Sequence, residues 1–272
     1  MCNVLEVTRS GYHSYLKQRY SQRKLDNRAI TELIQKIWEQ SHKLYGYRRV
    51  HAELHSQGVY CNKKRVLRLM KRNNIAAKRR KKFKRTTNSN HNNYISPNLL
   101  NQNFRVNSPN EVWVSDITYI STYEGWLYLA VVLDLYSRKV VGWSMSNRMT
   151  SQLVIDSLNN AIMDRKPADG LIFHSDRGSQ YASIDFRKSI KNNNIIQSMS
   201  GKGNCYDNAV AESFFHTLKT ELVYWERYKT RNQAKSSIFR FIEGFYNNRR
   251  RHSYLNYLSP NQYELLYFKL VA

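Results

Sequence analysis

A long basic stretch most constrains how this chain can fold. No Asp or Glu occurs from Leu54 to Asn110, while residues 63–85 contain 13 Lys and Arg. Residues 78–85 read KRRKKFKR, a run that cannot pack as an apolar core because burying a cation without a partner costs free energy. We therefore expect an extended arm that lies on phosphate groups, followed by a polar linker over residues 86–108.

The charge balance favours nucleic acid as a partner. The 272-residue chain carries a formal charge of +24; residues 1–110 hold 24 Lys and Arg against 5 acids, whereas residues 111–272 hold 20 against 15. An excess this uneven points to a polyanion. The three cysteines are isolated, which suggests neither a disulfide nor a thiolate zinc site. Because there is no apolar run of about 18 residues and no signal peptide, we expect a cytoplasmic protein without a membrane partner.

Region 1–85 is predicted to contain three helices. Apolar spacing places them at residues 26–42, 48–56 and 62–72, and Gly58 ends the second. Two helices joined by a short glycine-containing turn are typical of a helix-turn-helix, in which the third segment would read DNA. The alternative is a plain three-helix unit with a basic surface. The candidate DNA contacts in this region are Arg48, Arg49, Lys63, Lys64, Arg65, Arg68, Arg79 and Arg80.

Residues 109–272 are predicted to form a mixed α/β unit. Three apolar strands come first and suggest an antiparallel meander. Helices and strands then alternate, which supports a mixed sheet. The strands are expected at residues 112–120, 126–135, 139–144, 171–176 and 195–199, and the helices begin near Thr150, Ser183 and Asn208. Either Asp207 or Asn208 can cap the last of these helices.

Three acids of this unit stand in segments with no cation in their own apolar run. Asp116 lies within the first strand, Asp176 ends a later strand, and Glu212 lies on the following helix. A desolvated carboxylate needs a partner, and a divalent ion such as Mg²⁺ prefers hard carboxylate oxygens. Lys219 follows Glu212 by two helical turns and shares its face. The alternative for this Glu and Lys is a solvated helix face.

Two further charged features have competing interpretations. Asp134 lies beside a turn with Arg138 within reach, and we expect it to be structural. Three consecutive arginines, Arg249, Arg250 and Arg251, stand among aromatic residues. They fit either a contact with a nucleic-acid backbone or base, or a solvated helix end.

The surroundings of the three acids resemble a known family. Residues 113–119 read WVSDITY, residues 173–180 read FHSDRGSQ, and residues 207–215 read DNAVAESFF, with 35 residues between Asp176 and Glu212. In order and spacing these words resemble the Asp-Asp-Glu triad of bacterial insertion-sequence transposases of the second-reading-frame type, within the retroviral-integrase-like superfamily. The resemblance extends over nearly the whole chain.

The resemblance implies a ribonuclease-H-like α/β catalytic core with a C-terminal, Arg-rich helical extension, preceded by a small all-α helix-turn-helix domain. It implies a Mg-dependent polynucleotidyl transferase that cleaves the 3′ ends of its element and joins them to target DNA. Asp116 would be the ligand shared by two Mg²⁺ (or Mn²⁺) ions, with Asp176 and Glu212 as outer ligands. Lys219 would position the DNA end.

The partners implied are double-stranded DNA of the element ends and of the target, further copies of the chain, and the product of an upstream reading frame, either fused or separate. Action at the bacterial nucleoid follows from the same resemblance. Two alternatives stay open from the residues themselves. A ribonuclease-H-like nuclease would cut without joining, and a DNA-binding regulator would need no shared acid site.

Overall fold

The computed structural model describes residues 2–17, 21–78, 94–201 and 208–271. The chain forms two compact units, residues 1–79 and 80–272, and each is described by itself. The basic arm, with Arg79 and Arg80, lies mostly outside the described residues. Among the residues that are described, no helix is long and apolar enough to cross a membrane.

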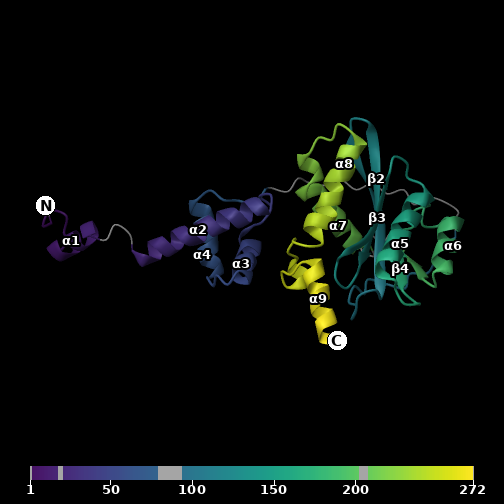
Figure 1. Cartoon of the computed structure of the whole chain (residues 1–272), viewed down its shortest axis with the longest axis horizontal. Coiled ribbons are helices and arrows are strands. Elements are labelled where there is room, and N and C mark those ends of the chain that lie inside the picture. The colour runs from purple at the N-terminus through teal and green to yellow at the C-terminus, as the bar shows by residue number, and fades with distance from the viewer. Residues whose placement is uncertain (1, 18–20, 79–93, 202–207, 272) are drawn as a thin grey trace. The chain divides into compact units, whose positions relative to one another are not determined.

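The first unit is helical (Figure 1). Its helices are α1 (Arg9–Lys17), α2 (Gln22–Gln40), α3 (Tyr47–Ser56) and α4 (Lys63–Arg72). The apolar faces of the last three meet in a small core in which Ile34, Val50, Leu54 and Val66 are fully buried. Three helices were expected in this core, and α2 begins a turn earlier than its apolar spacing indicated.

Two local signals fix the α3–α4 connection. Gly58 has a φ of +79°, a left-handed conformation that glycine adopts without strain, and it comes directly after the C-cap residue of α3. The Asn62 side chain then accepts a hydrogen bond of 2.8 Å from the Lys64 N–H and so caps α4. The result is a short turn between two helices, as the sequence predicts.

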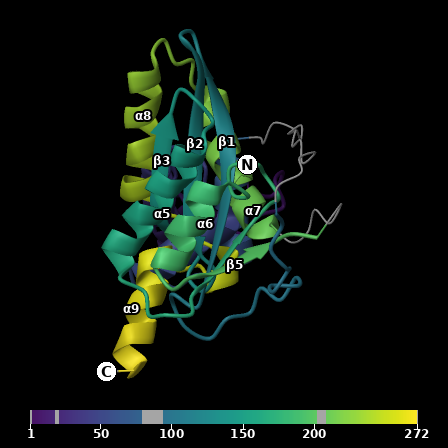
Figure 2. The ribbon, with the colours of Figure 1, turned by 90° about the vertical axis from the view of Figure 1, so that its right-hand side faces the viewer.

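The second unit is built on a five-stranded sheet in the order β3-β2-β1-β4-β5 (Figure 2). Its strands are β1 (Val112–Thr122), β2 (Gly125–Asp134), β3 (Val140–Ser146), β4 (Ile172–Ser175) and β5 (Ile196–Met199). The first three form the predicted antiparallel meander. β4 pairs in parallel with β1, and β5 pairs in parallel with β4. The mixed sheet expected from the pattern is therefore confirmed.

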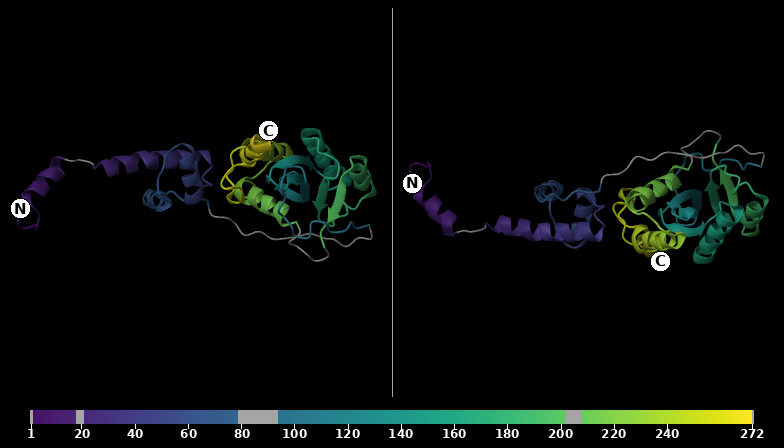
Figure 3. Two further views of the ribbon diagram at one scale, coloured as in Figure 1. Left: turned by 90° about the horizontal axis from the view of Figure 1, so that it is seen from below. Right: turned by 90° about the horizontal axis from the view of Figure 1, so that it is seen from above.

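Helices cover both faces of this sheet (Figures 1 and 3). On one face lie α5 (Ser151–Arg165) and α6 (Ile184–Asn192), and on the other lie α7 (Ala209–Glu221) and α8 (Arg231–Phe239). Gly142 of β3 allows α5 to approach closely, because a Cβ atom there would stand 2.3 Å from the Ser157 carbonyl oxygen. The core between α5, α6 and the sheet includes Trp113, Phe173 and Phe186.

The chain ends in further helical segments. They are η1 (Val223–Trp225), the π-helical η2 (Arg240–Tyr246) directly after α8, η3 (Ser253–Leu255) and α9 (Pro260–Val271). Asn247, next after η2, bonds both the N–H and the carbonyl of Val140 at 3.0 Å. This side chain completes part of the outer edge of β3, which would otherwise offer bare backbone groups.

Candidate active site

The sheet brings two of the three acids to neighbouring positions. Asp116 lies in the middle of β1, and Asp176 follows the last residue of β4. The two strands run parallel, and Ser115 pairs with Ser175 at their last shared position. Asp116 follows Ser115 and Asp176 follows Ser175, so the two acids occupy the next position along adjacent strands. Adjacent strands lie about 4.8 Å apart.

The third acid, Glu212, lies on α7. Glu212 lies in the first turn of this helix and is exposed. Its N–H donates to the Asn208 carbonyl, and the Asn208 side-chain amide donates to the Ser115 carbonyl at 3.3 Å. The start of α7 is thereby joined to β1 at the residue before Asp116.

Electrostatics show that the acids share one environment. Burial raises the pKa of Asp116 well above its usual range, and the charges of Asp176 and Glu212 raise it further. The Ile117 N–H, which donates to Asp116 at 2.7 Å, and the Lys219 cation act in the opposite direction. Three carboxyl groups and one ammonium group therefore lie within electrostatic reach of one another.

Lys219 is buried within this group. It is only 7% exposed, and its Nζ stands 5.0 Å from the centre of the Tyr119 ring. Burial lowers the pKa of Lys219, while the charge of Asp116 raises it. The alternative of a solvated helix face is therefore wrong for Lys219.

The donors fit a divalent cation. Carboxylates that repel one another are stabilised by a shared ion with hard-oxygen preference, such as Mg²⁺. Within the described ranges, no three His, Cys, Asp or Glu side chains already surround a common point as metal ligands do. The described residues thus show acids near one another and no formed metal site, and Asp116, Asp176 and Glu212 stay the candidate ligands.

Sequence relatives place this site in a family. Residues 106–205 and 212–266 match two models that are each described as an integrase core domain, and residues 24–83 match an HTH-like domain. The chain is 44% identical over 266 residues to the transposase InsF for insertion sequence IS3A of Escherichia coli (strain K12), which covers 97% of this chain and 92% of the relative. The chain belongs to the IS3 family of insertion-sequence transposases.

A second relative matches this chain along its full length. The insertion element IS600 uncharacterized 31 kDa protein of Shigella sonnei is 43% identical over 272 residues, the full length of both chains. The HTLV-2 integrase catalytic core domain in complex with magnesium (trimeric form) aligns with 59% of this chain and 99% of that chain, at 18% identity and a TM-score of 0.45. The transposase thus combines an HTH-like region with an integrase core.

In the helical unit of the transposase, most predicted DNA contacts face solvent. Arg48, Lys63, Lys64 and Arg68 are exposed. Arg49 is half-buried, with its guanidinium 5.5 Å from the centre of the Tyr45 ring. Arg65 is also half-buried and donates from Nε to the Asn27 side chain at 2.8 Å, so part of its role is to join α4 to α2.

The three consecutive arginines have different surroundings. Arg250 is 4% exposed and donates two hydrogen bonds, of 2.7 and 2.8 Å, to the Glu221 carboxylate. Arg251 is 7% exposed and donates to the Tyr257 carbonyl at 2.9 Å. Arg249 is exposed. We therefore correct the expectation for Arg250 and Arg251, whose guanidinium groups hold the C-terminal segments in place, and keep Arg249 as a candidate DNA contact.

Sequence reasoning missed several polar residues beneath the acids. Gly178 donates its N–H to Asp176 at 2.9 Å, and a Cβ atom on this glycine would stand 3.0 Å from the same carboxylate oxygen. Ser115 and Tyr181 share a hydrogen bond of 2.8 Å in the core below. The Asp-x-Gly order signals a turn that can bond its own acid. Nothing in the sequence pairs Ser115 with Tyr181.

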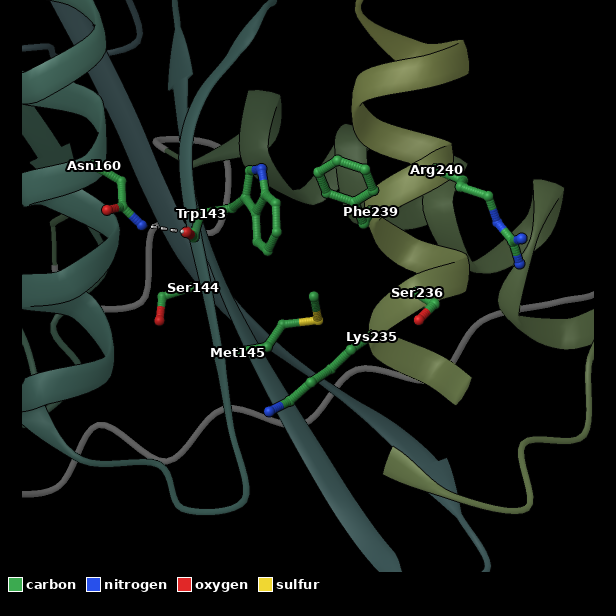
Figure 4. Close-up of a pocket in the computed structure, with 8 residues that line it drawn as sticks. All are labelled: Trp143, Ser144, Met145, Asn160, Lys235, Ser236, Phe239 and Arg240. Carbon is green, nitrogen blue, oxygen red and sulfur yellow. Dashed lines mark hydrogen bonds between the residues drawn. The ribbon is translucent and has the colours of Figure 1, made fainter. Parts of the chain in front are cut away.

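A separate hollow lies at the outer edge of the sheet (Figure 4). Its volume is about 490 Å³, and it lies between β3, α5 and α8. Trp143, Met145 and Phe239 supply apolar surface, while Lys235 and Arg240 supply positive charge. None of the three acids lines it, so this hollow is distinct from the candidate active site.

Proposed function

We propose that this transposase binds the ends of its insertion element, cleaves their 3′ ends and joins them to target DNA in a metal-dependent reaction. The observation that carries this proposal is the meeting of three acid-bearing segments at Asp116. The parallel register of β1 and β4 supplies Asp176, and the bond from α7 to β1 supplies Glu212.

Each acid has a distinct place in the proposed reaction. The charges of Asp176 and Glu212 both act on Asp116. As the family resemblance implies, Asp116 would be the shared ligand, with Asp176 and Glu212 as the outer ligands. When bound, two Mg²⁺ or Mn²⁺ ions would activate the attacking oxygen and stabilise the leaving oxygen. No side chain needs to form a covalent bond to DNA, since water attacks first and the freed 3′-hydroxyl attacks second.

Lys219 positions the DNA end in this scheme. It shares the α7 face with Glu212, and its charge acts on Asp116 from a buried place beside Tyr119. A cation held there favours a phosphate that approaches the acids. The contact is charge-assisted, which makes it stronger than a neutral hydrogen bond.

The proposed partners follow from the two units. The exposed cations of α4, the basic arm and Arg249 would neutralise DNA phosphates. Two element ends and one target require more than one active site, which favours several copies of the chain on DNA. The proposal also includes the product of an upstream reading frame as a partner, either fused or separate, and action at the bacterial nucleoid.

The decisive test is the full-length Asp176→Asn variant with Mg²⁺ and DNA that carries the element end. Cleavage and joining should fall to background, because a neutral amide is a poor ligand for Mg²⁺, while DNA binding stays near the wild-type level. Asp185→Asn is the matched control, since Asp185 is an exposed acid in the first turn of α6. Wild-type turnover by Asp176→Asn would refute the site.

The products separate the alternatives. Joined DNA from the wild-type protein supports a transposase mechanism with strand transfer. Cut DNA that is never joined would support a nuclease. Binding without either product would support a DNA-binding regulator.

A second test concerns where DNA affinity resides. Each phosphate neutralised by a Lys or Arg releases counterions, so affinity should fall steeply as salt rises. Replacing Lys64, an exposed residue of α4, by Ala should lower the slope of log affinity against log salt by about 1. An unchanged slope would remove Lys64 from the interface. If residues 105–272 alone bound the end DNA as tightly as the full chain, the assignment of affinity to the basic region would be wrong.

A further inference from the structure

Ser115 occupies an unusual place beneath the candidate active site. It is fully buried and directly precedes Asp116 on β1. Side chains alternate along a strand, so Ser115 points away from the face that carries Asp116. Its polar groups nevertheless have defined partners: its hydroxyl lies 2.8 Å from the Tyr181 hydroxyl, and its carbonyl accepts from Asn208 at 3.3 Å.

Tyr181 connects Ser115 to the segment of Asp176. The Tyr181 N–H donates to the Gly178 carbonyl at 3.0 Å, and the Gly178 N–H donates to the Asp176 carboxylate at 2.9 Å. Burial, and then the negative charges of Asp116 and Asp176, raise the pKa of Tyr181 well above its usual range. Its hydroxyl therefore stays protonated at physiological pH.

Asn208 connects Ser115 to the segment of Glu212. Its carbonyl accepts the Glu212 N–H at 3.1 Å, while its side-chain amide reaches across to β1. Asn208 stands at the N-cap position of α7, but its side chain makes no cap bond. It is 5% exposed, and in the described part of the chain its Oδ1 is buried with no hydrogen-bond partner. The Asn208 side chain thus bonds β1 and does not cap its own helix.

We propose that Ser115, Tyr181 and Asn208 are positioning residues that hold the three acid-bearing segments together. Ser115 is the shared point: the chain itself connects it to Asp116, Tyr181 connects it to the Asp176 turn, and Asn208 connects it to the start of α7. This inference rests on the proposed function of the three acids as metal ligands.

The physical reason lies in repulsion between the acids. Three carboxylates close together push their segments apart, and without restraint each segment would relax away from the others. Neutral hydrogen bonds beneath the site oppose this separation without adding charge. Groups that orient metal ligands in this way affect metal affinity by about 10- to 100-fold when they are removed.

The test measures metal binding by the full-length protein without DNA. Mn²⁺ serves as the probe, and its affinity is measured by calorimetry or by electron paramagnetic resonance. Tyr181→Phe and Asn208→Ala should each weaken Mn²⁺ binding by about 10- to 100-fold. The Mg²⁺ concentration that gives half-maximal cleavage should rise in the same proportion, while cleavage at saturating Mg²⁺ changes less.

Asn160→Ala is the matched control. Asn160 of α5 also donates its side-chain amide to a strand carbonyl, that of Trp143 on β3, at 3.0 Å (Figure 4). This bond has the same chemistry but lies at the far edge of the sheet. Its loss should leave Mn²⁺ affinity unchanged. If Asn160→Ala and Asn208→Ala had the same melting temperatures and the same Mn²⁺ affinities, Asn208 would be merely structural.

A double-mutant cycle tests the bond between Ser115 and Tyr181. Ser115→Ala removes one hydroxyl and Tyr181→Phe removes the other, so the double variant should bind Mn²⁺ no more weakly than the weaker single variant. Additive losses would show that the two residues act separately and would overturn the shared role of Ser115.

Asp116→Asn separates this inference from the proposed function. If the wild-type protein binds Mn²⁺ and Asp116→Asn does not, the metal site stands, and wild-type affinity in Tyr181→Phe and Asn208→Ala would overturn only the positioning role. If Asp116→Asn binds Mn²⁺ as tightly as the wild type, both proposals fail.

Discussion

Two groups of acids in the α/β unit have opposite surroundings. Asp134, Glu221 and Glu264 are buried among positive or donor groups. Asp134 accepts from the backbone N–H groups of residues 110, 136 and 137, at 2.7 to 3.0 Å. Glu264 takes two bonds of 2.9 Å from Arg165, and Glu221 takes two from Arg250.

In the candidate active site, by contrast, an acid has other acids as neighbours. The neighbours that shift Asp116 most, after burial itself, include the acids Asp176 and Glu212. The comparison teaches that burial alone does not mark a functional acid, since Asp134 is fully buried and structural. What distinguishes the site is that two further acids raise the pKa of Asp116, whereas Glu221 and Glu264 each accept two hydrogen bonds from an arginine.

The largest expected effect concerns the buried acids outside the candidate active site, of which Glu221 is one. Arg250→Ala should lower the free energy of unfolding by about 3–5 kcal/mol, because it leaves the Glu221 carboxylate buried without its bidentate partner. Chemical denaturation of the full chain measures this change. Arg249→Ala is the control, because Arg249 is exposed and a surface change stays within about 0.5 kcal/mol. Equal stability of the two variants would contradict the structural role of Arg250.

Lys219→Ala tests the cation whose charge lowers the pKa of Asp116. The variant should fold normally and still bind metal, yet join DNA ends poorly, because a lost contact to a charged phosphate is worth roughly 1.5–3 kcal/mol. Lys219→Arg should keep part of the activity. Wild-type strand transfer by Lys219→Ala at limiting DNA would show that this buried cation plays no part in positioning DNA.

The free energy of unfolding of Asp116→Asn tests whether the three acids repel one another. The folded protein raises the pKa of Asp116 above its unfolded value of about 3.9, so the folded state binds this proton more tightly. Wild-type stability without metal should therefore fall as pH rises between the two pKa values, by at most about 1.4 kcal/mol per pH unit from this group. At neutral pH Asp116→Asn should be the more stable protein, and the difference should vanish at pH values below the unfolded pKa.

Asp134→Asn provides the contrast for that experiment. Its carboxylate accepts several N–H groups, and an amide can replace only part of these bonds, so this variant should lose about 1–3 kcal/mol at neutral pH. Added Mg²⁺ should stabilise the wild type and not Asp116→Asn. Burial raises the pKa of Asp134 as well, so the response to Mg²⁺ is the measurement that separates the two variants. Equal responses of the two Asn variants to Mg²⁺ would erase the difference between the two groups of acids.

Much of the fold could be predicted from the sequence because its elements are encoded locally. Alternating apolar runs gave the strands of the meander, and the Asn62 cap with Gly58 marked the short turn between α3 and α4. The prediction that Asp134 is structural is confirmed, although its partners are backbone N–H groups. Arg138 lies instead with its guanidinium 4.3 Å from the centre of the Tyr254 ring.

The sequence by itself determined which residues are candidates for the chemistry and in what order they stand, because the three acids, their spacing and the basic stretch are properties of the chain. Only the tertiary structure decided which side chains meet. Glu221 and Arg250 are far apart in sequence, as are Ser115 and Asn208, and no local pattern specifies such pairs. A hydrogen bond or ion pair depends on distances of a few ångströms, and these are fixed only when the sheet and its covering helices pack together.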